Sequence, residues 1–412
     1  MIIDCDEKKN ALRNLFKNSK VAFIYGAAGT GKSTMINYIS SLFKDKQKIF
    51  LANTNPAVEN LRRKVTAEHA EFVTITKFLS KDVSNDCDIL CLDECSTISN
   101  RDMVRVLQRA QCKLLVLVGD IYQIESILFG NWFNIAYKVM PKDSVAELTR
   151  PHRTTVQGLI EVWNKVREIT EDRLEFITRN GLSSTLDESI FSRTEEDEIV
   201  LCLNYDGIYG INNINKFLQS NNVNPSINWG VLSYKVGDPV LFNESNRFAP
   251  LVYNNLKGKI LQIEEEEDCI YFTIEVYTVL NELDVIGFDL ELKESVTDET
   301  SVIRFKVGRG GDGNDDNDNV ENVVPFQVAY AISIHKAQGL EYESVKVVIT
   351  SEIEEMVSHN IFYTAITRAK SKLKIYWSPE TEKRILENMK VQFNDKDYQL
   401  FKAKYKEALL KS

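Results

Sequence analysis

Short apolar runs recur along the first 120 residues of the chain. They read VAFIY, IFLAN, FVTIT, DILCLDE and LLVLVGD, and between them lie stretches whose apolar residues return every three to four positions. The short runs are typical of buried strands and the stretches between them of helices. Strands that alternate with helices predict a parallel sheet with helices on both faces over residues 21–118.

The pattern changes twice further along the chain. Residues 155–220 have a helical pattern that ends in a strand-like run, IVLCLNY, whereas short β-rich runs such as GDPVLF and CIYFTIEVYTVL begin at Gly237. We therefore expect an α/β protein in which a small β-barrel interrupts a second α/β domain. The predicted boundaries are 1–145 for the first domain, 146–236 and 323–412 for the two parts of the second, 237–305 for the barrel, and 306–322 for a flexible acidic and glycine-containing linker.

The first strand is followed by a phosphate-binding pattern in IYGAAGTGKSTMINYI. Glycines allow backbone N–H groups to turn inward around phosphate oxygens, a lysine supplies a positive charge, and the following hydroxyl can hold Mg²⁺. A chance glycine-rich turn would not be flanked by both a strand and a helix. The predicted nucleotide-binding residues are Gly26, Ala27, Ala28, Gly29, Thr30, Gly31, Lys32, Ser33 and Thr34.

Two later strands end in polar side chains suited to hydrolysis. DILCLDE places Asp93 and Glu94 after an apolar strand, where Asp93 can coordinate Mg²⁺ and Glu94 can polarise a water for attack on the γ-phosphate. The next strand ends in VGDIYQ, and the amide of Gln123 can sense the same phosphate. A paired carboxylate favours hydrolysis over transfer to a small acceptor.

Other candidate sites are weaker. The seven cysteines are an odd number and suit free thiols in a reducing compartment. Cys87, Cys91 and Cys95 lie across an apolar strand and the turn after it, and because side chains of a strand alternate between its faces, this spacing favours structural thiols over a metal cluster. A calcium loop starting at Asp312 fails at its sixth and twelfth positions. A nuclease-like set in DLELKES (Asp289, Glu291 and Lys293) arises easily in a charge-rich segment. The aromatic residues Phe129, Trp132 and Phe133 could stack on bases or pack in a core.

The amino-acid composition excludes few classes of protein. With 412 residues and 43% hydrophobic content the chain can form several packed domains, and no apolar run reaches 18 residues, so we expect a cytoplasmic protein without a membrane segment. The net charge of −10 is concentrated in three acidic runs at 195–198, 264–268 and 312–321, which hold 14 acidic residues. The rest of the surface can therefore carry a basic channel for nucleic acid.

Five further segments resemble, in order, motifs of superfamily 1 helicases of the RecD, Dda and Upf type, with a UvrD-like C-terminal helicase domain. They are LANTNPAVENL, VTITKFL, ELTRPHR, AISIHKAQGLEYESV and IFYTAITRAK. Together with the phosphate loop and the Asp93–Glu94 pair, they extend the resemblance from about residue 4 to about residue 376.

This resemblance implies two RecA-like P-loop NTPase domains, with a small SH3-like β-barrel inserted in the second, that hydrolyse ATP with Mg²⁺ in the cleft between them. Single-stranded DNA, or RNA, is the implied partner, and a fused or associated effector or nuclease subunit is a further one. The implied catalytic residues are Lys32, Asp93, Glu94, Gln123, Arg153 and Arg368, with both arginines as fingers and Ser33 and Asp93 as metal ligands. Nucleic acid would contact Thr54, Asn55, Thr74, Ser333, His335 and Lys336, and the nucleotide would also contact Gly339 and Glu341 within the coupling segment that includes Gln338.

The expected function is an ATP-driven translocase and helicase that moves 5′ to 3′, as the RecD and Dda branch does. Two alternatives stay open: a nucleic-acid-activated ATPase switch or sensor without processive unwinding, and a P-loop kinase or GTPase, which leaves Arg153 and HKAQGLE without a role. Two features depart from the family pattern. Lys8 stands where relatives carry an adenine-reading glutamine, and the short spacer before DILCLDE allows only a small strand-separating pin.

Overall fold

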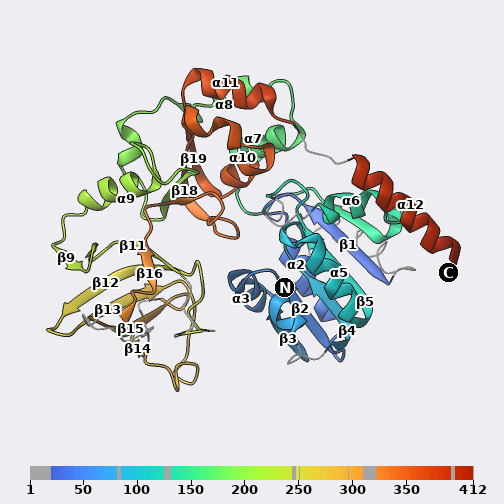
Figure 1. The fold of residues 1–412 in the computed structure, drawn as a ribbon, viewed down its shortest axis with the longest axis horizontal. Helices are drawn as coiled ribbons and strands as arrows, with labels where there is room; N and C mark the ends of the chain where they lie inside the picture. Colours follow the sequence, from blue (N-terminus) through green and yellow to red (C-terminus); the bar gives the residue numbers. More distant parts are fainter. Residues whose placement is uncertain are drawn as a thin grey trace, which may run out of the picture. The chain divides into compact units, whose positions relative to one another are not determined.

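The computed structural model describes residues 20–80, 85–124, 131–243, 247–249, 251–295, 297–309, 322–390 and 395–411. Lys8, Phe129, residues 312–321 of the segment counted as a calcium loop, and most of the predicted linker lie outside these ranges. The chain divides into two compact units, the first formed by Met1–Ser183, Glu354–Leu373 and Pro379–Ser412 and the second by Ser184–Ile353 and Lys374–Ser378. Figure 1 shows the elements of each.

The first unit is built on a six-stranded parallel sheet, which confirms the α/β class predicted from the sequence. Strand β2 is buried along its whole length, as expected where helices cover both faces of a parallel sheet. In sheet order the strands are β3 (Ala70–Thr74), β2 (Lys48–Ala52), β4 (Asp86–Leu92), β5 (Gln111–Gly119), β1 (Val21–Gly26) and β6 (Val145–Leu148).

The helices of this unit lie between its strands and after them in the sequence, and the last of them come from the C-terminal part of the chain. They are α2 (Lys32–Leu42), α3 (Asn55–Lys64), α4 (Ile75–Leu79), α5 (Asn100–Arg109), α6 (Trp132–Val139), α7 (Gln157–Glu168), α8 (Arg173–Arg179), α10 (His359–Ile366), α11 (Pro379–Asn388) and α12 (Asp395–Lys411).

Each face of the sheet carries its own apolar core. One core contains Ile24, Ile36 and Phe50, and the other contains Phe23, Phe78 and Phe133. The Phe133 ring stacks on Phe23 with ring centroids 4.3 Å apart and is fully buried, so this aromatic belongs to the core and does not offer its face to a base.

The second unit contains two larger sheets and a short hairpin. One of these sheets has the strand order β17 (Ala331–Ser333), β8 (Glu198–Cys202), β18 (Tyr342–Val348), β19 (Ala369–Tyr376) and β7 (Ser183–Ser184), with β8 parallel to β17 and β18. Residues 369–373 of β19 and Ser183 of β7 fall within the residue ranges of the first unit. Helix α9 (Ile211–Ser220) packs on β17, and β9 (Ser226–Trp229) pairs with β10 (Leu232–Lys235).

An antiparallel six-stranded sheet, which we call the inserted sheet, lies between β10 and β17 in the sequence. Its order is β14 (Glu291–Lys293), β15 (Ser301–Gly308), β13 (Cys269–Val276), β12 (Lys257–Glu265), β11 (Pro239–Phe242) and β16 (Phe326–Val328). Strand β13 alternates strictly between buried and half-buried residues, because one face packs on an aromatic core that includes Phe272, Phe305 and Phe326.

The cysteines and carboxylates of the weaker candidate sites are buried or held in ion pairs. Cys87, Cys91 and Cys95 are buried, and desolvation raises the pKa of the Cys87 thiol to about 12. Asp289 pairs with Arg247, whereas Glu291 pairs with Lys293, so different partners hold the two carboxylates. In the described ranges no set of three or more His, Cys, Asp or Glu side chains is arranged to hold a metal ion.

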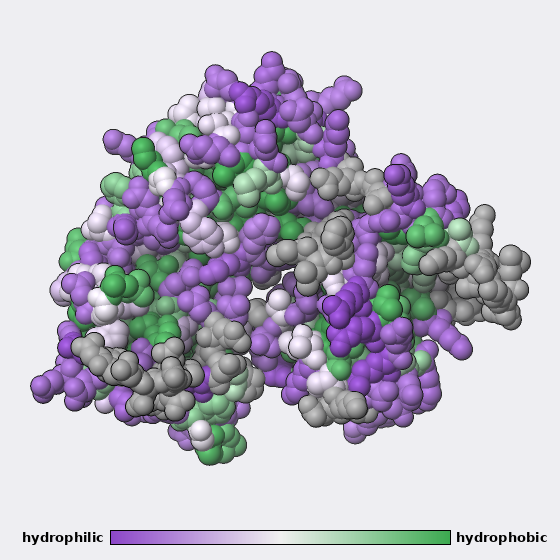
Figure 2. All heavy atoms as spheres, viewed as in Figure 1, coloured by the Kyte–Doolittle hydropathy of each residue, from purple (hydrophilic) through white to green (hydrophobic). Residues whose placement is uncertain are grey.

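No helix among the described residues combines the length and the apolar character needed to cross a membrane. Figure 2 shows hydrophilic residues over much of the visible face.

Candidate nucleotide and nucleic-acid site

The loop between β1 and α2 has the backbone that phosphate binding requires. Gly29 and Gly31 have φ values of 76° and 79°, which L side chains rarely adopt. A Cβ on Gly26 would lie 2.4 Å from the carbonyl oxygen of Leu148, so only glycine fits beside β6. Helix α2 begins at Lys32 directly after Gly31, which places its N-terminal N–H groups and its positive dipole end at the loop.

Lys32 points its ammonium group into the loop. Its Nζ donates hydrogen bonds to the carbonyl oxygens of Gly26 at 2.8 Å and Ala27 at 2.9 Å. Burial lowers the pKa of Lys32, and the carboxylates of Asp120 and Asp93 act against that shift. The loop therefore holds a positive charge in a largely desolvated place, where its attraction for a phosphate is strong.

Asp93 and Glu94 follow β4, as the sequence predicts. The Glu94 N–H donates to Asp93 Oδ1 at 2.8 Å, and Glu94 itself has a φ of 51°, an uncommon conformation for a residue other than glycine. Burial, with a further contribution from Asp93, raises the pKa of Glu94 to about 7, while Arg368 and Lys32 oppose the shift. A carboxyl group with this pKa can accept a proton from water near neutral pH.

Asp120 is a site residue that the sequence reasoning missed. It follows β5 as Asp93 follows β4, and its side chain is 2% exposed. Its Oδ1 accepts a hydrogen bond from the Tyr122 N–H at 3.0 Å, whereas Oδ2 is buried with no hydrogen-bond partner among the described residues. Burial raises the pKa of Asp120, and Lys32 is the main opposing charge. The sequence signal that could have identified Asp120 is its place in VGDIYQ, as an acidic residue directly after a strand.

Gln123 lies in the turn that Asp120 begins, and its N–H donates weakly to the Asp120 carbonyl at 3.4 Å. Its neighbour Ile124 donates its N–H to Thr364 Oγ1 on α10 at 3.2 Å. The Gln123 turn is therefore held against the helix that precedes Arg368.

Both predicted arginine fingers lie in the first unit with the phosphate loop. Arg153 Nη1 donates to the Thr367 carbonyl at 2.6 Å, and the N–H of the preceding His152 donates to the Gly29 carbonyl at 2.6 Å. A Cβ on Gly29 would lie 2.4 Å from the Cβ of Arg153, so the arginine passes directly over the loop.

Arg368 is 1% exposed and is held by the end of α10. Its Nε donates to the Thr364 carbonyl at 2.9 Å and its Nη2 to Thr367 Oγ1 at 3.2 Å. Its positive charge lowers the pKa of both Glu94 and Asp120 against the effect of burial. Arg368 therefore lies within electrostatic range of the two carboxylates.

Tyr363 is a second contact that the sequence reasoning missed. It is fully buried on α10, and its hydroxyl oxygen accepts a hydrogen bond from the Ala28 N–H of the phosphate loop at 3.4 Å. Burial raises the pKa of this phenol, so it stays neutral. The residue lies in the quoted segment IFYTAITRAK, but only the tertiary contact gives it a role.

The predicted nucleic-acid contacts of the first unit lie at the ends of neighbouring strands. Ala52 of β2 pairs with Thr74 of β3, so Thr54 and Thr74 follow the same edge of the sheet. Thr54 Oγ1 accepts from the Ala57 N–H at 3.4 Å and Thr74 Oγ1 from the Lys77 N–H at 3.2 Å, which makes each hydroxyl an N-cap. Thr54 and Asn55 are exposed and Thr74 is half-buried.

The remaining predicted residues belong to the second unit. Ser333 ends β17 and its Oγ accepts from the Lys336 N–H at 3.2 Å, while the Lys336 ammonium donates to Gln327 Oε1 at 2.8 Å. His335 is exposed. Gln338 Nε2 is buried without a hydrogen-bond partner in the part of the chain that the structure describes, and Gly339 has a φ of 81°. The Glu341 carbonyl accepts from Lys257 at 3.2 Å.

The fold and this constellation define a P-loop ATPase: a glycine-rich loop at a helix N-terminus, a strand-end carboxylate pair and two arginines beside them. Comparison with family models supports this class of protein. Residues 5–187 match an AAA domain and residues 328–376 match the UvrD-like helicase C-terminal domain.

The chain is similar to curated relatives and to a solved structure. The chain is 24% identical to an uncharacterized protein of Methanocaldococcus jannaschii, over 89% of this chain and 37% of that protein. It is 23% identical to the RecBCD enzyme subunit RecD of Buchnera aphidicola, over 92% of this chain and 76% of the subunit. The structure of the Bacteroides Pif1 helicase in complex with ADP-AlF3 and single-stranded DNA has the same fold, with a TM-score of 0.57, 17% identity, and 99% and 98% of the two chains covered.

The chain therefore contains segments that match an AAA domain and a UvrD-like helicase C-terminal domain, and it is similar in sequence to RecD and in fold to Pif1. It spans about a third of the length of the M. jannaschii relative and about three quarters of the RecD subunit.

Proposed function

We propose that this protein is an ATP-driven motor that translocates along single-stranded DNA in the 5′ to 3′ direction and separates the duplex ahead of it. The observation that carries the proposal is the gathering of Lys32, Glu94, Arg153 and Arg368 around one phosphate loop. Such a set neutralises the charge on a transferring phosphoryl group and activates water beside it.

The chain's own groups divide the chemistry between them. Lys32 and the N–H groups of the loop bind the β- and γ-phosphates, and Glu94 accepts a proton from the attacking water. Arg153 and Arg368 stabilise the negative charge that spreads over the transferring group. Ser33 and Asp93 offer the hydroxyl and carboxylate oxygens that suit Mg²⁺, and the unpartnered Asp120 Oδ2 is a further oxygen nearby. The ion, when bound, would neutralise phosphate charge.

The strand would be held by two sets of residues whose grip alternates with the state of the nucleotide. Thr54, Asn55 and Thr74 form the first set, and Ser333, His335 and Lys336 the second. Hydroxyl, amide and ammonium groups of this kind contact the phosphate backbone and not the base edges, so we expect little sequence preference. Gly339 and Glu341 connect the second set to the nucleotide, and the inserted sheet serves as the small SH3-like barrel.

The direction of movement is testable with duplexes that carry a single-stranded tail at one end. We expect unwinding of 5′-tailed substrates and little on 3′-tailed ones, because HKAQGLEYESV and YTAITRAK resemble the 5′-to-3′ branch. Streptavidin displacement from either DNA end serves the same purpose if unwinding is slow. Activity confined to 3′-tailed substrates would contradict the proposed direction.

A sensor function is the second candidate, favoured by the short spacer before β4, which allows only a small pin. Such a module would hydrolyse ATP in response to nucleic acid and signal to an associated effector or nuclease subunit. A high stimulated rate of ATP turnover with no displacement of DNA or streptavidin would favour this function over a motor.

The raised pKa of Glu94 predicts a rate that depends on pH. Because the base must be ionised, kcat/KM for ATP should rise about tenfold per pH unit below pH 7 and level off above it. The profile is measured with a saturating single-stranded oligonucleotide between pH 5.5 and 8.5. A Glu94→Gln variant should lose this rising limb, and a flat profile in the unmodified protein would contradict the role of Glu94.

A further inference from the structure

One set of polar contacts in the second unit adjoins Glu341 and is made by residues to which the proposed site gives no role. Lys257, at the start of β12 in the inserted sheet, donates from Nζ to Asp197 Oδ1 at 2.6 Å and to the Glu341 carbonyl at 3.2 Å. The same ammonium lies 4.1 Å from the ring centroid of Tyr342 and 5.1 Å from that of Tyr277. One lysine thus joins the inserted sheet to the segment that contains Glu341.

The ion pair is partly desolvated. The side chains of Lys257 and Asp197 are 19% and 25% exposed, whereas Lys259, two residues further along β12, is 34% exposed and pairs with Glu196, which is 76% exposed. Partial burial reduces screening by water and salt, so the Lys257 pair contributes more than the Lys259 pair. A cavity of about 90 Å³ beside it, lined in part by Arg193 and Tyr342, shows that apolar packing does not fill this junction.

Asp197 also holds the chain that follows Glu341. Its Oδ2 accepts from the Glu343 N–H at 3.2 Å, and its carbonyl accepts from the Ser344 N–H at 3.1 Å. The Lys257–Asp197 pair therefore clamps residues 341–343 at both ends, because Lys257 binds the Glu341 carbonyl and Asp197 binds the Glu343 N–H.

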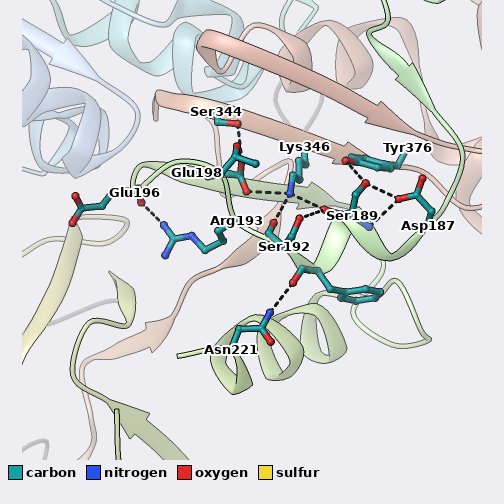
Figure 3. A network of polar contacts seen from close by, with 12 residues as sticks. Asp187, Ser189, Ser192, Arg193, Glu196, Glu198, Asn221, Ser344, Lys346 and Tyr376 are labelled. Carbon is teal, nitrogen blue, oxygen red and sulfur yellow. Dashed lines mark hydrogen bonds and ion pairs between the residues drawn. The ribbon is translucent and has the colours of Figure 1, made fainter. Parts of the chain in front are cut away.

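The position of Asp197 is itself fixed. Its neighbour Glu198 is buried on β8, where it pairs with Lys346 at 3.1 Å and accepts from Ser344 Oγ at 2.8 Å. Figure 3 shows Glu198 turned toward Lys346 and Ser344, while Glu196 points away from them. Glu198 thus holds the start of β8 inside its own sheet, and Asp197 directly before it pairs with Lys257 of the inserted sheet.

The other end of the coupling segment is tied to the same sheet. Lys336 donates to Gln327 of β16, and β16 pairs with β11 through Leu241 and Gln327. Residues 333–343 are thus attached to the inserted sheet at two places, by Lys336 before the Gly339 turn and by Lys257 after it.

We propose that Lys257 is a positioning residue that couples the inserted sheet to residues 339–343, so that the stimulation of ATP hydrolysis by bound single-stranded DNA depends on the Lys257–Asp197 ion pair. The inference rests on the proposed function. It identifies the inserted sheet as part of the response of the ATPase to the bound strand.

Lys257→Met tests this inference, since it keeps the length of the side chain and removes the charge. In the full chain we expect stimulated turnover to fall about tenfold or the oligonucleotide concentration for half-maximal stimulation to rise by that factor. Unstimulated turnover and the KM for ATP should stay unchanged. Lys257→Arg should restore most of the response, and Lys259→Met, the matched control on the same strand, should behave as the unmodified protein.

Hydrogen–deuterium exchange gives a reading that does not depend on activity. Peptides covering residues 339–345 should lose protection in Lys257→Met and keep it in Lys259→Met, because the Glu343 N–H is bound to the carboxylate that Lys257 holds. Lys257→Arg keeps the positive charge and the donors and leaves Asp197 in place, so it should keep the protection, and it decides the matter if Lys257→Met folds poorly.

Unchanged stimulation together with unchanged exchange in Lys257→Met would overturn the inference, as would an equal loss in Lys259→Met. A failure of the proposed function is a different result. If single-stranded DNA does not stimulate the unmodified protein at all, the motor is wrong, whereas the exchange data still accept or reject the clamp.

Discussion

Glu94→Gln should bind ATP normally and hydrolyse it about 10³-fold more slowly than the unmodified protein. Glutamine keeps the size of the side chain and removes only the group that accepts the proton of the attacking water. Because the pKa of Glu94 is raised to about 7, replacing the carboxyl with a neutral amide changes the local charge less than it would for an ordinary acid. Nucleotide affinity is measured with a fluorescent ATP analogue and turnover with phosphate release.

Lys32→Ala should abolish turnover by a different route, through an affinity for ATP weakened by about tenfold to a hundredfold. The reason is that Lys32 reaches into the loop and contributes a charge that the phosphates need. Lys44→Ala, an exposed lysine after the same helix, is the matched control and should change neither quantity. An equal loss of nucleotide affinity in Lys32→Ala and Glu94→Gln would contradict the roles assigned to both.

Removal of either proposed arginine finger should lower stimulated turnover by about 10³-fold or more, with a smaller effect on ATP binding. Arg153 crosses the phosphate loop at Gly29, and Arg368 is within electrostatic range of Glu94. For Arg153 the change is to alanine. For Arg368, which is 1% exposed, glutamine is preferable because it fills part of the space and retains a donor for the Thr364 carbonyl.

Arg150→Ala is the control for both, since Arg150 is exposed and lies three residues before Arg153. Thermal melting of each variant separates a folding defect from a catalytic one. Near-normal stimulated turnover in a folded Arg153 or Arg368 variant would mean that this arginine is structural.

The parts of the site that the sequence predicted are those whose role is local. The phosphate loop needs left-handed backbone at Gly29 and Gly31, and the pattern of residues that satisfies this demand lies within one short segment. Asp93 and Glu94 are likewise placed by the strand that precedes them, because parallel strands of one sheet end at the same edge.

Asp120 and Tyr363 escaped prediction because their roles depend on tertiary contacts. The Tyr363 hydroxyl accepts from Ala28, which lies 335 residues earlier in the chain, and no periodicity in either segment indicates that contact. Asp120 was visible as an acid at a strand end, but its significance comes from burial beside Lys32.

The architecture of the inserted sheet was also only partly predictable. Alternation along β13 marks a strand with one buried face, and the Asn254–Asn255 pair before β12 marks a turn. Strand β16, however, is three residues long and pairs with β11 across a separation of more than 80 residues. A pairing of that kind is determined by the aromatic core around Phe326 and leaves no local signal.

The most direct test of the account is ATP turnover by the unmodified protein with and without single-stranded DNA and RNA of matched length. The proposed motor function predicts low turnover by the protein without nucleic acid. Single-stranded DNA should increase turnover strongly, and the increase should saturate as the strand fills its site. Turnover indifferent to both nucleic acids would contradict it and would favour a P-loop kinase or GTPase.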